Sequence, residues 1–224
     1  MIDKNKWLNK LISKLRANFG NRLIFVGLQG SYRRGEATEA SDFDVMVVLD
    51  KLNIENLQVY RKIISTMPEH EKACGFIAGK AELLSWPKYE IFQLTQETEP
   101  YFGSLTNLLP SFTVMDIKDS IKISVANLYH AVCHLYIYGN PTTKLENLKG
   151  AYKSTFFILQ MLYYLKSGEY IHTKSELLHR LNGIEQKILL TSIEWNNLDL
   201  EYIENPNPFF ELLIIWSSEI LTTI

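Results

Sequence analysis

The sequence has 224 residues, of which 46% are hydrophobic and 21% charged, with a formal net charge of −2 at pH 7. This length suits one large or two small domains with a buried core, and the composition is that of a globular protein, not a disordered one. This slightly negative net charge provides no positive electrostatic field that would bind a nucleic-acid backbone, which counts against an enzyme that acts on DNA.

Two further global features limit the class of protein. The two cysteines, Cys74 and Cys133, lie in apolar contexts and form neither a disulfide framework nor a metal-binding spacing. The first six residues are too charged for a secretory signal, and no apolar run reaches the length of a transmembrane helix. We therefore expect a cytoplasmic protein.

The chain is expected to open with an amphipathic helix that Asp3 caps and Gly20 ends. A buried strand over 23–28 follows and closes at Gly30 and Ser31. At this point the chain can turn and leave backbone N–H groups available to an anion. The turn therefore predicts a phosphate-binding loop.

A polar loop leads from this turn to a second strand that contains two carboxylates. Asp42 and Asp44 are two residues apart in it, so we expect both side chains on one face of the strand, because side chains alternate. Hard oxygen ligands suit Mg²⁺, which takes one or two protein carboxylates and completes its shell with water and substrate phosphate. A phosphate turn beside a pair of Mg²⁺ ligands indicates a nucleoside triphosphate as substrate.

The stretch from the first strand to the second, LIFVGLQGSYRRGEATEASDFDVMVVLD, resembles the signature of the nucleotidyltransferase superfamily. That superfamily includes aminoglycoside adenylyltransferases and minimal nucleotidyltransferases. The loop GSYRRG is also similar to that of family X DNA polymerases, where the serine and the second arginine hold triphosphate oxygens. The resemblance implies that Asp42 and Asp44 hold Mg²⁺, while Gly30, Ser31 and Arg34 bind the phosphates of ATP or another NTP.

Enzymes of this superfamily commonly carry a third carboxylate on a neighbouring strand, as a metal ligand or general base. The apolar run 73–78 is expected to form that strand, yet it holds Cys74 and no acid. Glu71, Glu82 and Glu90 are the candidates. The alternative is that the base is missing, which leaves open a weakened or inactive enzyme.

The rest of the chain reads mainly as helices. A helix is predicted over 54–67, and the segment 90–102 predicts a further strand or helix without deciding between them. After about residue 110 the apolar spacing predicts helices only. They are expected over 116–138, 145–166, 175–182, 184–195 and 208–220. We therefore expect an α+β chain: a polymerase β-like catalytic domain of mixed sheet and helices over 1–114, and an all-α helical bundle over 115–224.

Two features of the helical half bear on function. His130 and His134 share one helix face, but a zinc site needs a third ligand and none is near, so we interpret them as surface or interface histidines. The concentrated aromatic residues are expected to be bundle core, with Tyr136 and Tyr152 as the candidates for stacking a base or an acceptor.

The segment GEYIHTK, which ends at Lys174, is similar to the second domain of streptomycin/spectinomycin adenylyltransferases. In those enzymes a lysine reaches the triphosphate, which implies nucleotide binding by Lys174. The segment is one residue longer here, and the arginine expected on the preceding helix is absent around Gln160.

The resemblance implies a Mg²⁺-dependent nucleotidyltransferase that moves an NMP, foremost AMP from ATP, onto a hydroxyl of a small molecule such as an aminoglycoside-like antibiotic. The alternatives are a protein-adenylylating enzyme of the antitoxin kind and a degenerate nucleotide-binding module without catalysis. The expected partners are the NTP and an unidentified hydroxyl acceptor. Neither a membrane nor a nucleic acid is expected, and a homodimer stays open.

Overall fold

The computed structural model describes residues 1–198 and 205–224. It divides into two compact units, Met1–Phe112 and Thr113–Ile224, which are described one at a time. Whether they fold as the independent domains expected over 1–114 and 115–224 stays a prediction.

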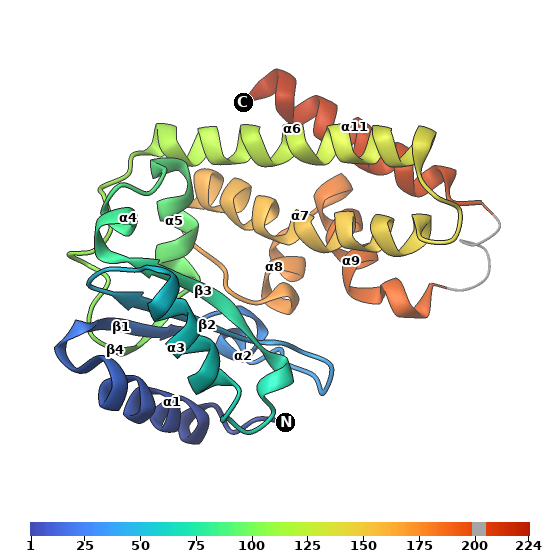
Figure 1. Cartoon of the computed structure of the whole chain (residues 1–224). Helices are drawn as coiled ribbons and strands as arrows, with labels where there is room; N and C mark the ends of the chain where they lie inside the picture. The colour runs from blue at the N-terminus through green and yellow to red at the C-terminus, as the bar shows by residue number, and fades with distance from the viewer. Residues whose placement is uncertain (199–204) are drawn as a thin grey trace. The chain divides into compact units, whose positions relative to one another are not determined.

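The first unit is built on a mixed four-stranded sheet (Figure 1). Its strands are β1 (Leu23–Leu28), β2 (Phe43–Leu49), β3 (Ala73–Gly79) and β4 (Glu99–Phe102), in the order β3-β2-β1-β4. β1 pairs antiparallel with both β2 and β4, whereas β2 and β3 are parallel. The mixed sheet with helices confirms the predicted α+β class.

Helices cover both faces of this sheet. One face packs against α1 (Lys4–Phe19) and α3 (Ile54–Ile64) through the odd-numbered residues of β2. The other face carries Met46 and Val48, which pack against α4 (Lys80–Leu84) and the segment 105–109. Because strand side chains alternate, Asp44 belongs to this second face.

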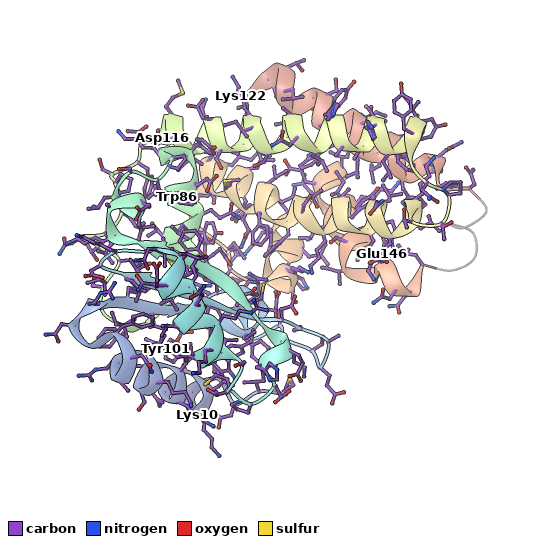
Figure 2. The ribbon with its side chains drawn as sticks, in the orientation of Figure 1. Lys10, Trp86, Tyr101, Asp116, Lys122 and Glu146 are labelled. Carbon is purple, nitrogen blue, oxygen red and sulfur yellow. The ribbon has the colours of Figure 1, made fainter. Side chains whose placement is uncertain are left out.

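Local signals set the boundaries of α1 as predicted. The Asp3 carboxylate accepts a hydrogen bond from the Lys6 N–H at 3.0 Å, and Gly20 ends the helix. Its buried face carries the predicted apolar residues, while Lys10 lies on the exposed face (Figure 2).

Two sequence-based boundaries need correction, and one undecided segment is settled. β2 begins at Phe43, so Asp42 precedes the strand and is not part of it. The predicted turn at Gly30 continues into a short helix, α2 (Gly30–Arg34), because its first residues find helical hydrogen bonds and Gly35 ends it in the left-handed conformation. The undecided segment contains both a helix, α5 (Lys88–Gln96), and strand β4.

The second unit is helical, as predicted. Its helices in the described ranges are α6 (Val114–Tyr138), α7 (Lys144–Ser167), α8 (Lys174–Arg180), α9 (Gly183–Glu194) and α11 (Asn207–Thr223). α6 runs alongside both α7 and α11 (Figure 1). Short 3₁₀ turns occur at Gly20–Arg22, His70–Lys72 and Trp195–Asn197.

The aromatic residues of this unit are mostly core. Tyr152 is fully buried and its hydroxyl donates to the Phe209 carbonyl at 3.0 Å, so its suggested stacking role is wrong. Tyr136 is 44% exposed and packs against Phe210 and Lys144. None of the described helices is both long enough and apolar enough to cross a membrane.

Phe43, between the two aspartates, anchors the start of β2. It is fully buried, with its ring centroid 4.6 Å from that of Trp7 and 4.7 Å from that of Tyr32. Phe43→Ala should lower the free energy of unfolding by about 3–5 kcal/mol, because it removes a buried ring and leaves a cavity. Urea unfolding measures this loss. Leu57→Ala, on the exposed side of α3, is the control and should change stability by less than about 0.5 kcal/mol.

Candidate active site

The phosphate turn and the second aspartate are in direct contact. The Gln29 N–H donates to the Asp44 carbonyl at 2.9 Å, which joins the end of β1 to the start of β2. Gly30 has a φ of +66°, and a Cβ atom placed there would overlap the Asp44 carboxylate. Only glycine fits this position without displacing Asp44.

The two aspartates differ in environment. Asp44 is half-buried within β2, whereas Asp42 is exposed directly before the strand. Two carboxylates separated by one residue repel each other unless a cation lies between them. The two carboxylates fit a magnesium ion, which prefers hard oxygen ligands and leaves positions for phosphate oxygens. The adjacent glycine turn offers N–H donors to those phosphate oxygens.

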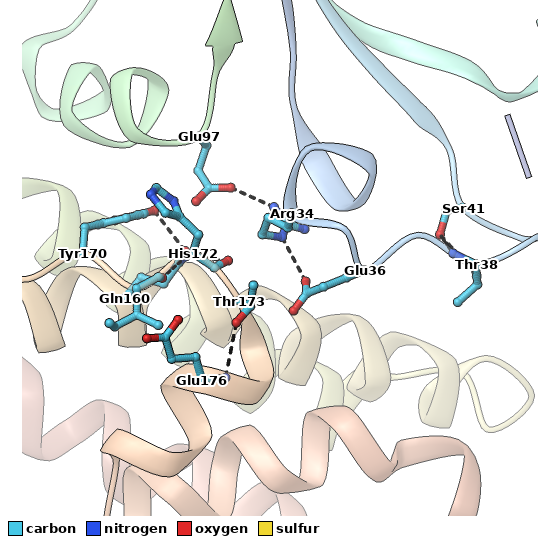
Figure 3. Close-up of polar contacts among 11 residues, drawn as sticks. Arg34, Glu36, Thr38, Ser41, Glu97, Gln160, Tyr170, His172, Thr173 and Glu176 are labelled. Atoms are coloured by element: carbon cyan, nitrogen blue, oxygen red, sulfur yellow. Dashed lines mark hydrogen bonds and ion pairs between the residues drawn. The ribbon is translucent and has the colours of Figure 1, made fainter. Parts of the chain in front are cut away.

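Arg34 lies in a cluster of carboxylates (Figure 3). Its side chain is 8% exposed, with Nε 3.0 Å from Glu36 Oε2 and Nη1 2.8 Å from Glu97 Oε2. Ser31 lies one turn earlier in α2, and its carbonyl accepts the Glu36 N–H at 2.9 Å. The guanidinium of Arg34 is therefore fixed by two acids from the same unit.

Glu97 is a site residue that the sequence did not reveal. It is buried and lies two residues before β4, at the same edge of the sheet as Asp44, because Glu99 pairs with Leu28 and Leu28 pairs with Val45. Its neighbour Thr98 accepts a hydrogen bond from Gln29 Nε2 at 2.8 Å. The only sequence signal was an acid before a possible strand, in a segment whose type could not be decided.

The position where a third carboxylate was expected is occupied by a cysteine. In the parallel pairing of β2 and β3, Cys74 lies directly opposite Asp44. No group of three His, Cys, Asp or Glu side chains within residues 1–198 and 205–224 is arranged to hold a metal ion. The two aspartates are thus a pair without a third protein ligand in the described part of the chain.

The three predicted candidates for the third carboxylate lie elsewhere. Glu82 packs against Gly79, five residues beyond Cys74, which is about 16 Å along a parallel strand. Glu90 accepts a hydrogen bond from Trp86 Nε1 at 2.7 Å. Glu71 precedes β3 at the edge that carries Asp42, but it is exposed and lies 3.6 Å from His70.

Tyr60 is another ionisable group near Cys74. The two residues line a pocket of about 360 Å³ against β3. Burial, with a smaller contribution from the Cys74 charge, raises the pKa of Tyr60 to about 12. This phenol therefore stays protonated near neutral pH and does not supply the missing base.

Lys174 is the first residue of α8 in the second unit. Its ammonium lies 5.7 Å from the centre of the Phe156 ring, and Thr173 caps the helix through the Glu176 N–H. The preceding loop is held by Gln160, which is fully buried and donates to the Ile171 carbonyl at 2.7 Å (Figure 3). Gln160 thus has a structural role in the region of the helix where the resemblance implies an arginine.

The contact between Gly30 and Asp44 can be tested with a matched pair of glycines. Gly30→Ala should weaken Mg²⁺-ATP binding by about tenfold or more, because the added Cβ displaces the Asp44 carboxylate. Gly35 also has a positive φ, of +73°, but a Cβ there meets no atom within 4 Å. Gly35→Ala should therefore show backbone strain in urea unfolding while keeping nucleotide affinity within about twofold. Titration calorimetry measures the Mg²⁺-ATP affinity of both variants. An equal loss of affinity in the two would contradict a role of the Gly30–Asp44 contact in nucleotide binding.

Known proteins resemble this chain in sequence and in fold. A Methanocaldococcus jannaschii protein, named as a candidate protein adenylyltransferase, is 40% identical over 63 residues, which cover 27% of this chain and 43% of that protein. The match thus spans less than half of the relative's length.

A solved structure shows a likeness of fold. It is the crystal structure of spectinomycin adenyltransferase AAD(9) from Enterococcus faecialis with ATP and spectinomycin, which has a TM-score of 0.61 and 17% identity and covers 98% of this chain and 99% of that one. The sequence model of the nucleotidyltransferase domain family matches residues 8–119, which are half of the sequence. The chain therefore belongs to the nucleotidyltransferase domain family.

Proposed function

We propose that the chain transfers a nucleoside monophosphate, foremost AMP from ATP, to a hydroxyl group of a small molecule. The observation that carries this proposal is the packing of the Gly30 backbone on the Asp44 carboxylate. It places the proposed anion-binding turn against the proposed metal-binding side chain, so phosphate oxygens and a metal ion could be held at one point.

Asp42 and Asp44 would hold Mg²⁺. When bound, the ion would neutralise charge on the triphosphate and on the departing pyrophosphate. Gly30 and Ser31 would orient the phosphate chain through backbone and hydroxyl donors. Catalysis would then rest on positioning and electrostatics, with little covalent chemistry left to the protein.

Arg34 would bind a phosphate oxygen from the position that Glu36 and Glu97 give it. The ion pair between Arg34 and Glu97 is buried on both sides, which makes the guanidinium rigid and costly to displace. Lys174 is a further phosphate-binding candidate by resemblance, contributed by the helical unit.

A small hydroxylated acceptor is supported by the fold. The full-length structural neighbour was crystallised with ATP and spectinomycin. A cationic, aminoglycoside-like acceptor would call for acidic side chains that can pair with it, but Glu36 already pairs with Arg34 and Glu90 accepts a hydrogen bond from Trp86. We therefore propose a small-molecule acceptor and do not favour a polycationic one.

Two other functions have specific support. The short match to a protein named as a candidate protein adenylyltransferase favours a protein hydroxyl as acceptor. The cysteine opposite Asp44 favours a module that binds nucleotide without transferring it. Labelled ATP incubated with spectinomycin, aminoglycosides, lincosamides and cell lysate distinguishes the three, because label appears on a small molecule, on a protein or on neither.

Asp44→Asn tests the role of the metal-binding carboxylate. The variant keeps the shape of the side chain, so folding should be intact while Mg²⁺-dependent transfer falls by about a hundredfold or more. Asp50→Asn is the matched control, because Asp50 follows the same strand and forms an exposed ion pair with Arg22, at 3.0 Å. Transfer from labelled ATP measures both, and an unchanged rate in Asp44→Asn would refute the mechanism.

Cys74→Asp tests whether the missing carboxylate limits the rate. It places an acid opposite Asp44, so Mg²⁺-dependent transfer should rise by about tenfold or more if a general base or third ligand is lacking. Cys74→Ser, which adds no charge, should leave the rate within about twofold. A wild-type rate that neither variant alters would mean that the base lies elsewhere in the chain.

A further inference from the structure

Two histidines on α6 lie one helical turn apart in the second unit. His130 and His134 are both exposed, and their ring centroids are 6.1 Å apart with ring planes inclined by 46°. Residues four apart on a helix project from the same side. The two imidazoles are therefore neighbours held at a fixed spacing by a helix of 25 residues.

These rings line a shallow hollow of about 380 Å³ between α6 and α7. Its other lining residues are Ala131, Leu135, Asn147 and Ala151, none of which is charged. His134 also packs against Tyr138, with ring centroids 5.1 Å apart. In the part of the chain that the structure describes, neither imidazole forms an ion pair, so charge pairing does not account for their placement.

We propose that His130 and His134 bind a divalent transition-metal ion of the Zn²⁺, Ni²⁺ and Cu²⁺ class. Imidazole nitrogens suit these ions, whereas Mg²⁺ and Ca²⁺ prefer oxygen ligands. This site is separate from the carboxylate pair of the first unit and does not depend on the proposed transferase activity.

The number of ligands sets the character of the site. A closed structural zinc site uses four protein ligands, and no group of three is arranged for a metal among the described residues. The interpretation from sequence excluded a site of that closed kind, whereas the site proposed here is an open one with two protein ligands. Two imidazoles therefore leave positions for water, and the ion should exchange readily. The affinity should follow the order Cu²⁺ above Ni²⁺ and Zn²⁺.

The spacing of the two ligands exists only while α6 is helical. An ion that bridges adjacent turns binds the folded protein better than the unfolded chain, so it should stabilise folding in proportion to its concentration. This gives a second readout that is independent of catalysis.

The direct test is calorimetric titration of the full-length protein with ZnCl₂ in excess MgCl₂, which occupies the carboxylate site. We expect one Zn²⁺ per chain. Either His130→Ala or His134→Ala should weaken binding by about tenfold or more, because the second ligand acts at a high effective concentration once the first has bound. His179→Ala removes an exposed histidine of α8 whose Nδ1 lies 2.6 Å from the Ser175 carbonyl, and should leave affinity within about twofold.

The stability readout should follow the same pattern. ZnCl₂ should raise the urea midpoint of the wild type and of His179→Ala, but not of His130→Ala or His134→Ala. The proposal is overturned if the α6 variants bind Zn²⁺ as tightly as the wild type, or if His179→Ala weakens binding equally. Loss of binding in Cys133→Ser with both histidines present would also overturn it.

Discussion

The close approach of the Gly30 backbone to the Asp44 carboxylate is the constraint on which the candidate active site depends. It requires the end of β1 and the start of β2 to be adjacent, which the antiparallel pairing of Leu28 with Val45 provides. It also requires Asp44 to face away from α1 and α3, which the burial of Phe43 on their side ensures. Core packing on one face of the sheet thereby positions the chemistry on the other.

Electrostatics at this edge of the sheet support the proposal that a metal ion accompanies the nucleotide. Asp42, Asp44, Glu36 and Glu97 supply four carboxylates, against two guanidinium groups from consecutive arginines in α2. A triphosphate adds further negative charge, so its approach is unfavourable unless cations offset the repulsion. The paired state of Arg34 strengthens this argument, because much of its charge is already compensated by acids.

Local patterns predicted much of the fold from the sequence. Helix α1, strand β1 and the long helices of the second unit follow from apolar periodicity and capping residues. The spacing of the two aspartates predicted one strand for both, whereas Asp42 lies before β2 and only Asp44 lies within it. Glu97 could not be predicted, because its place beside Arg34 depends on the pairing of β4 with β1 across about 70 residues of sequence. The absence of an acid on β3 was predicted, whereas the register that sets Cys74 against Asp44 needed the structure.

The dependence of ATP binding on Mg²⁺ tests the central claim most directly. Calorimetric titration of the wild-type protein with ATP should give a saturable binding heat in MgCl₂ and little or none in EDTA, because the carboxylate-rich site repels an uncompensated triphosphate. Equal affinity in MgCl₂ and in EDTA would contradict the claim that the Gly30 turn and Asp44 together form a metal-nucleotide site.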